Sequence, residues 1–149
     1  MEIKKLFDYE IIQEEDVEIT GTSKGDLLIS PTTGGRFYGE ELNGTLLPVG
    51  IGTTYTHGTE NDIRSTTLLR TDDGCDILMD MKAFLSVPED VEERLMRGEH
   101  TDDESYYYKG IVSFQTGSEK YKWLERKVCL CECVIHDWTR LTTSVYMVI

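Results

Sequence analysis

Apolar and polar residues alternate along most of this chain, which is the pattern of β-strands that bury one face. The clearest case is the segment 75–82, in which Asp76 and Asp80 alternate with apolar residues. Asp73-Gly74 precedes it and supplies the positive φ angles that a tight hairpin turn requires, and the segment 63–70 lies before that turn. An amphipathic antiparallel pair of strands is therefore expected here.

Further strands are expected wherever the same alternation lies between turn residues. The segments with this pattern are 6–12, 17–20, 27–30, 37–41, 45–47, 106–115, 127–135 and 141–149. Gly34-Gly35 and Gly39 are interpreted as a turn and a bulge rather than as a phosphate-binding loop, because a strand-like segment and not a helix follows them.

One segment has a helical pattern. Ser86-Val87-Pro88-Glu89 has the spacing of a capping box, and Gly98 is placed to end a helix. Val87, Val91 and Leu95 fall on one face of that helix. A short amphipathic helix near residues 87–97 is expected to pack against the sheet or to plug one of its ends.

The strand count favours a closed all-β architecture. About nine or ten strands at hairpin spacing leave an antiparallel β-barrel, lipocalin-like in general architecture, or a β-sandwich. Arg64 and Thr66 alternate with Ser65 and Thr67, so polar groups lie on both faces of one strand, which suits a barrel with a partly polar interior. With 149 residues, the chain is expected to form a single β-barrel domain over 1–149.

The charge of the chain excludes some partners. It has 28 acidic and 15 basic residues, a formal net charge of −13, which argues against binding to nucleic acid or to an anionic membrane. The sequence has no targeting segment and no apolar run of roughly 18 residues, so a cytoplasmic protein is expected.

Cys129, Cys131 and Cys133 stand at alternate positions of one expected strand. They are interpreted as small apolar side chains on one face, in a reducing compartment. A metal or redox site would need His136 or Cys75 brought to them, and neither a metal nor a cofactor is predicted.

Several motifs in order resemble the domain of unknown function 3237 family, also called uncharacterised protein family 0311. They cover nearly the whole chain: the segments 31–44, 47–48, 69–74, 94–99, 107–108, 114–117, 121–124 and 145–148. The resemblance implies a single β-barrel domain that forms an oligomer, and it implies no particular reaction.

The chain departs from the family at several polar positions. After Leu47-Pro48 the family tends to have Gly-Gly-x-Asp-Trp, and this chain has Val-Gly-Ile-Gly-Thr instead. The family's Arg-Tyr before the Thr-Asp-Asp-Gly turn aligns with Thr66-Thr67, and its Arg after the aromatic pair aligns with Lys109. The chain therefore keeps the structural motifs of the family but lacks several of its polar residues.

The leading functional hypothesis is a barrel that binds a small organic molecule, either anionic or carbonyl-bearing, in its interior or mouth. Cationic and aromatic side chains on otherwise apolar strands motivate it. The residues expected to line the site are Tyr38, Arg64, Tyr108, Lys109 and Trp123, with His57 on the rim.

Two alternatives remain. One is a cofactor-independent lyase, isomerase or cyclase, with His57, Asp76 or Asp80 as general base and Arg64 or Lys109 stabilising an enolate-like charge. If Asp76 and Asp80 face inward, confinement is expected to raise the pKa of both carboxyls. The other is a structural or interaction subunit of a homo-oligomer.

Overall fold

The strands and helices follow the alternation closely. The computed structural model describes residues 1–138 and 140–149, and in them the chain forms nine strands, one α-helix and two short 3₁₀-helices. The strands are β1 (Ile3–Gln13), β2 (Val17–Thr22), β3 (Gly25–Tyr38), β4 (Gly44–His57), β5 (Glu60–Thr71), β6 (Asp76–Ser86), β7 (Tyr107–Thr116), β8 (Cys129–Asp137) and β9 (Arg140–Val148). The helices are α1 (Glu89–Met96), η1 (Asp103–Ser105) and η2 (Lys122–Arg126).

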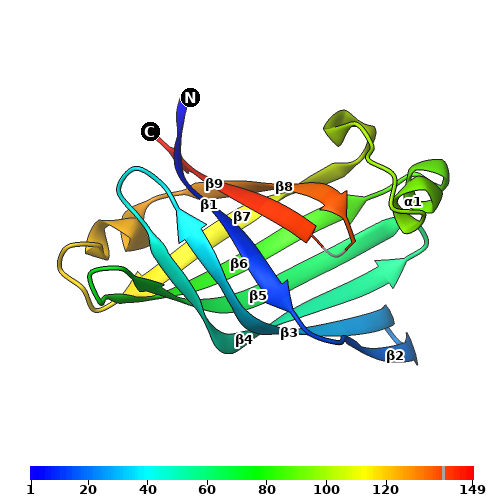
Figure 1. Ribbon diagram of the computed structural model, residues 1–149, viewed down its shortest axis with the longest axis horizontal. Helices are drawn as coiled ribbons and strands as arrows, with labels where there is room; N and C mark the ends of the chain where they lie inside the picture. Colours follow the sequence, from blue (N-terminus) through cyan, green and yellow to red (C-terminus); the bar gives the residue numbers. More distant parts are fainter. Residues whose placement is uncertain (139) are drawn as a thin grey trace.

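The sheet closes on itself. Its strand order is β1-β9-β8-β7-β6-β5-β4-β3-β2, and β1 also pairs with β3. These pairings make an antiparallel barrel of β1 and β3 to β9, with β2 outside it on the edge of β3 (Figure 1). The prediction of an antiparallel barrel with one short helix is confirmed.

The expected hairpin is formed by β5 and β6. Their register runs without a shift from Glu60 opposite Ser86 to Arg70 opposite Asp76. At the turn, Gly74 has a φ of 88°, and the Thr71 amide donates to the Cys75 carbonyl at 2.8 Å. The tight turn predicted from Asp73-Gly74 is therefore present.

Two strands are longer than expected. The segments 27–30 and 37–41 were expected as separate strands, but residues 27–30 and 37–38 belong to β3, because Gly34 and Gly35 bend that strand instead of ending it. A register shift between Pro31 and Gly35 marks the expected bulge. The segment 45–47 was also expected as a short strand, but β4 continues through residues 50–57 to the turn at Gly58.

The helix forms where it was expected, but without its capping box. Pro88 stands at the N-cap with no side-chain hydrogen bond, because the Ser86 hydroxyl donates to Glu60 Oε1 at 2.8 Å. Val91 and Leu95 are buried against the barrel, and Gly98 ends the helix with a φ of 76°. None of the described helices is long and apolar enough to cross a membrane.

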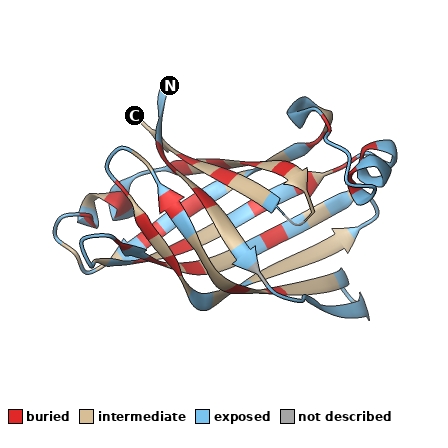
Figure 2. Ribbon diagram, viewed as in Figure 1, coloured by how far each residue is buried: buried red, intermediate tan, exposed pale blue. Residues whose placement is uncertain are grey.

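Two apolar clusters fill different parts of the barrel (Figure 2). The larger one includes the rings of Phe7, Phe37 and Phe114 and is joined by Leu124 of η2. The smaller one packs the buried face of α1 against strand residues such as Ile135. One end of the barrel is therefore filled, and α1 covers part of the other.

Asp73 in the β5–β6 turn is expected to make stability fall in acid. The Lys120 ammonium, 2.7 Å away, together with the hydroxyls of Thr71 and Tyr121, holds the pKa of the Asp73 carboxyl at about 2. In the unfolded chain an aspartate has a pKa of about 3.9, so the folded protein binds fewer protons between these values. The stabilisation is complete above about pH 4 and is lost as the pH falls towards about 2.

Asp73→Asn should flatten this part of the pH profile. Urea unfolding between about pH 6 and about pH 2 is expected to show the variant less stable at the upper end and equal to the parent at the lower end. Asp72→Asn, in the same turn, controls for disturbance of the turn. A difference between Asp73→Asn and the parent that is the same at every pH would contradict the charge-based explanation.

Candidate ligand-binding site

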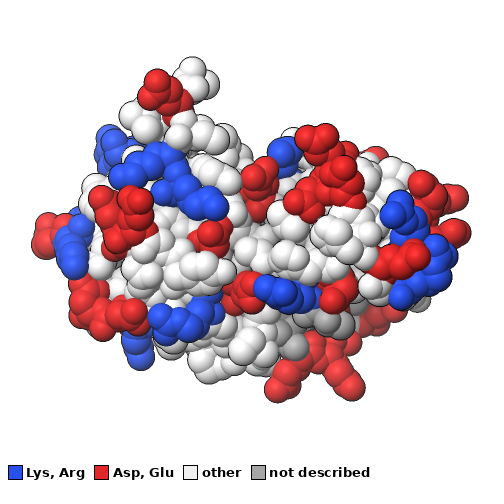
Figure 3. Space-filling view, turned by 45° about the horizontal axis from the view of Figure 1, so that its top comes forward, with Lys and Arg blue, Asp and Glu red and all other residues white. Residues whose placement is uncertain are grey.

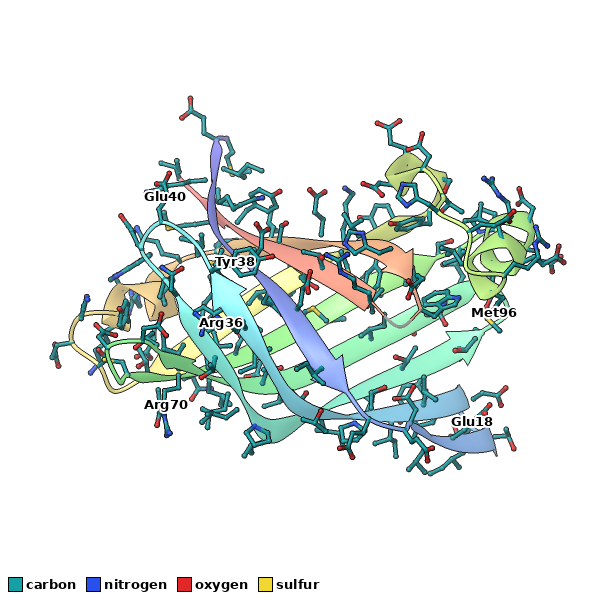
Figure 4. All side chains as sticks on the ribbon, in the orientation of Figure 1. Glu18, Arg36, Tyr38, Glu40, Arg70 and Met96 are labelled. Carbon is teal, nitrogen blue, oxygen red and sulfur yellow. The ribbon has the colours of Figure 1, made fainter. Side chains whose placement is uncertain are left out.

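A cavity of about 420 Å³ lies in the barrel interior. Its wall includes inward-facing residues from β1 and β3 to β9, and Glu92 and Met96 of α1 reach it from the covered end. Asp16, between β1 and β2, also lines the cavity. Figure 4 shows Met96 and Glu18 at this end of the molecule.

The cavity exists because small residues face it across three neighbouring strands. Ser30, Gly52 and Ser65 are register partners on β3, β4 and β5, and all three line the cavity. A Cβ added at Gly52 would make only ordinary contacts, the nearest at 3.7 Å from the Ser30 carbonyl oxygen. This row of small side chains leaves space that larger residues occupy at the filled end.

Larger side chains with polar tips also line the cavity. Tyr9 of β1 is only 2% exposed, and its hydroxyl lies 3.6 Å from Met81 Sδ. Tyr108 of β7 stands beside the Cys133 thiol, and Thr143 Oγ1 donates to Cys133 Sγ at 3.5 Å. The wall therefore combines apolar surface with phenol, hydroxyl and thiol groups.

These groups are neutral at ordinary pH. Burial raises the pKa of Tyr9 and of Tyr108 well above the usual value of a phenol. Burial also raises the pKa of the Cys133 thiol to about 12. Both phenols are thus held as hydrogen-bond donors, and Cys133 is held as an unreactive thiol.

Two buried polar atoms in the cavity wall lack partners in the described part of the chain. They are Ser65 Oγ and Trp138 Nε1. A buried hydroxyl or indole N–H without a hydrogen bond costs about 1–3 kcal/mol. Each would gain a partner from a bound molecule or a water.

The cavity has no cation in its described lining. Its charged residues are Asp16 and Glu92, both exposed at the mouth. On the outside, patches of Asp and Glu side chains and patches of Lys and Arg side chains are interspersed on the visible face (Figure 3). An anion would therefore meet acidic groups at the entrance and no positive charge inside.

Of the five residues expected to line the site, Tyr108 does so. Arg64 and Lys109 point outward, because the strand faces that point inward carry Ser65 and Tyr108. Lys109 Nζ pairs there with Glu132 Oε2 at 3.1 Å. The expectation that Arg64 and Lys109 line the interior is therefore corrected, because both lie on the outer face.

The two remaining aromatics also lie outside the cavity. Tyr38, 46% exposed, is at the end of β3 remote from Met96 (Figure 4). Trp123 belongs to η2 and packs against the large apolar cluster at the filled end. The expected lining role is corrected for both.

The candidate bases do not face the interior either. His57 ends β4 beside the mouth, but its side chain is exposed, with Nε2 3.9 Å from Asp62 Oδ2. Asp76 pairs on the outer face with Arg70 at 2.7 Å, which lowers the pKa of its carboxyl instead of raising it. Asp80 is also on the outer face, where it accepts a hydrogen bond from Thr66.

The sequence reasoning missed Tyr9, Ser65 and Thr143. Each stands in a segment whose alternation was recognised, so each was a candidate for an inward position. The missing information was the barrel register. It decides which inward-facing residues stand beside one another, and therefore where small residues gather. Cys129, Cys131 and Cys133 do lie buried on one face of β8, as expected.

The fold and cavity define an antiparallel β-barrel with one filled end and one open end. The chain belongs to the family described as Protein of unknown function (DUF3237), which matches residues 1–148. A UPF0311 protein of Clostridium acetobutylicum is 30% identical over 102 residues, which span 68% of this chain and 65% of that relative.

Solved structures share the whole architecture. A conserved protein of unknown function from Rhodopseudomonas palustris has a TM-score of 0.90 at 24% identity, covering 99% of this chain and 97% of that one. A β-barrel-like protein from Acinetobacter baumannii has a TM-score of 0.83 at 26% identity, covering 98% and 94%. The barrel and the family are thereby established.

Proposed function

We propose that the barrel binds a small uncharged organic molecule that carries a carbonyl or a similar hydrogen-bond acceptor. The observation that carries the proposal is the cavity of about 420 Å³, whose interior holds the protonated phenols of Tyr9 and Tyr108. Ligand pockets of small molecules commonly have volumes of about 300–1,000 Å³, with a few polar groups on an apolar wall. The anionic ligand expected from the sequence is not supported by this lining.

The polar groups favour an acceptor over a donor. The O–H groups of Tyr9 and Tyr108 lie beside the sulfur atoms of Met81 and Cys133, which are weak acceptors that a carbonyl oxygen can replace, and Ser65 Oγ lacks a hydrogen-bond partner among the described residues. A carbonyl oxygen can accept from two donors at once through its two lone pairs. The apolar part of such a molecule would lie against Ile63, Met81 and Leu85.

A thermal-shift screen tests the proposal with matched pairs of neutral ketones or lactones and the corresponding carboxylates. Neutral carbonyl compounds are expected to raise Tm in a dose-dependent way, because a ligand that binds only the folded state stabilises it. The carboxylates should raise it less or not at all.

Two variants separate binding in the cavity from surface effects. Gly52→Leu places a side chain in the cavity and should abolish the shift while the protein stays folded. Tyr108→Phe removes one donor and should weaken binding about 2- to 10-fold, the effect of one hydrogen bond. A ligand that still binds Gly52→Leu with the parental affinity would place the site elsewhere.

A cofactor-independent isomerase, lyase or cyclase is the second candidate function. It is favoured by the two protonated phenols, since donors of this kind stabilise an enolate-like oxygen. Such a reaction also needs a base, and the carboxylates of the described lining are Asp16 and Glu92 at the exposed mouth. Binding alone requires no such group and is the better-supported function.

A further inference from the structure

A second hollow lies on the outer surface of the barrel, over β4, β5 and β6. It has a volume of about 240 Å³, and we call it the basic groove. The side chains that matter in it are Lys24, Tyr55, Asp62, Arg64, Lys82 and Phe84. The side chains of these six residues lie on the outer face of the barrel, so the groove is distinct from the cavity described above, although Ile63 borders both.

Two cations of the basic groove are direct neighbours. Arg64 of β5 is the register partner of Lys82 of β6, and both are exposed on the same face. Directly opposed residues of an antiparallel pair have Cβ atoms about 4.5–5.5 Å apart, and like charges in that arrangement destabilise the sheet. The chain keeps this repulsive pair although it has an excess of acidic residues.

Among the residues that the structure describes, the cations of the groove form no ion pair with an acidic residue. Ten of the 15 Lys and Arg residues form ion pairs within 4.0 Å among the described residues. Lys24, Arg64 and Lys82 form none in that part of the chain, so three of the five unpaired cations gather in one groove. Asp62 also lines the groove, but its carboxylate faces His57 at 3.9 Å.

Two aromatic rings lie beside these cations. The Lys24 ammonium is 5.8 Å from the centroid of the Tyr55 ring, and the Lys82 ammonium is 5.5 Å from that of Phe84. Phe84 is 49% exposed. The groove therefore offers positive charge together with flat apolar surface.

We propose that the basic groove binds a small organic anion, in which a carboxylate or phosphate is attached to a flat apolar body. The anionic group would lie between Arg64 and Lys82, whose mutual repulsion it relieves. A guanidinium can donate two parallel hydrogen bonds to such a group. The apolar body would lie against Tyr55 and Phe84.

NMR titration of the ¹⁵N-labelled protein with four probes tests this proposal and identifies the anion. Phenyl phosphate and benzoate are expected to bind in a saturable way, with shift changes confined to residues around 53–55, 62–64 and 82–84. Inorganic phosphate should bind more weakly than phenyl phosphate because it has no ring. Neutral benzamide should not bind in the groove, and equal binding of benzamide and benzoate would overturn the proposal.

Substitutions supply the second arm of the test. Arg64→Gln should weaken binding about tenfold, the effect of a charge-assisted hydrogen bond pair. The Tm of the anion-free protein should stay the same or rise, because one member of a repulsive pair is removed. Lys127→Gln removes an exposed cation outside the groove and should change neither quantity.

The barrel variant distinguishes the two sites. Gly52→Leu fills the cavity but leaves the outer surface intact, so it should keep the parental affinity for phenyl phosphate. Loss of phenyl phosphate binding in Gly52→Leu, or its survival unchanged in Arg64→Gln, would show that the basic groove is not the site.

Discussion

Replacing Phe7 by alanine is expected to lower the free energy of unfolding by about 3–5 kcal/mol. The Phe7 side chain is 1% exposed, and its ring centroid lies 5.4 Å from that of Phe37 and 6.1 Å from that of Phe114. All three rings belong to the filled end of the barrel. Removing the Phe7 ring leaves a cavity, and strands held in a closed sheet cannot move inward to fill it. The loss of unfolding free energy should therefore lie in the upper part of the range for core substitutions.

Chemical denaturation of the parent and of Phe7→Ala measures this loss. Phe84→Ala is the matched control, because Phe84 is 49% exposed on the outer face, and its removal should change the free energy by less than about 1 kcal/mol. Similar losses in the two variants would contradict the assignment of Phe7 to a rigid, filled end.

The sequence predicted the barrel because its period of two is a local property. The hairpin of β5 and β6 follows from Asp73-Gly74 and from alternation on either side of that turn. Strand ends were less predictable, because Gly34 and Gly35 are compatible with a turn as well as with a bend inside a long strand. Only the pairing of β3 with both β1 and β4 decides between these two.

The candidate site was harder to predict, because it depends on which face of each strand points inward. Arg64 and Ser65 are adjacent polar residues on one strand, and a shift by one residue would exchange their faces. The structure places Ser65 in the cavity and Arg64 in the basic groove. The expected combination of cations and aromatics is thus present, but on the outside of the barrel.

The placement of the cations on the outer face and of neutral polar groups in the interior has a physical basis. A cation inside the barrel would lose much of its hydration. The carboxylates of the described lining, Asp16 and Glu92, lie at the exposed mouth and not in the interior, where they could pair with it. On the outer face the same cation stays hydrated, and the net charge of −13 helps to offset its repulsion from a neighbour. Neutral donors such as Tyr108 tolerate burial, so the interior suits neutral ligands.

Replacing Gly35 by alanine is expected to destabilise the protein by about 3–5 kcal/mol by opening the barrel. Gly35 has a φ of 146°, and a Cβ on it would lie 2.2 Å from the Glu10 carbonyl oxygen. Gly35 is the register partner of Ile11, so it lies in the seam where β3 closes on β1. Both backbone strain and a steric clash therefore act at the point of closure.

The functional consequence distinguishes this variant from a general loss of stability. Tyr9 and Ile11 line the cavity from β1, so an opened seam should remove ligand binding under conditions where most of the protein is still folded. Hydrogen exchange should show the amides of β1 and β3 exchanging faster, while those of the β5–β6 hairpin stay protected. Gly117→Ala is the control, because no atom lies within 4 Å of the added Cβ, and it should change stability by less than about 0.5 kcal/mol. Uniform acceleration of exchange across all strands in Gly35→Ala would mean that the barrel opens only by complete unfolding, and that the β1–β3 seam is not a separate unit of stability.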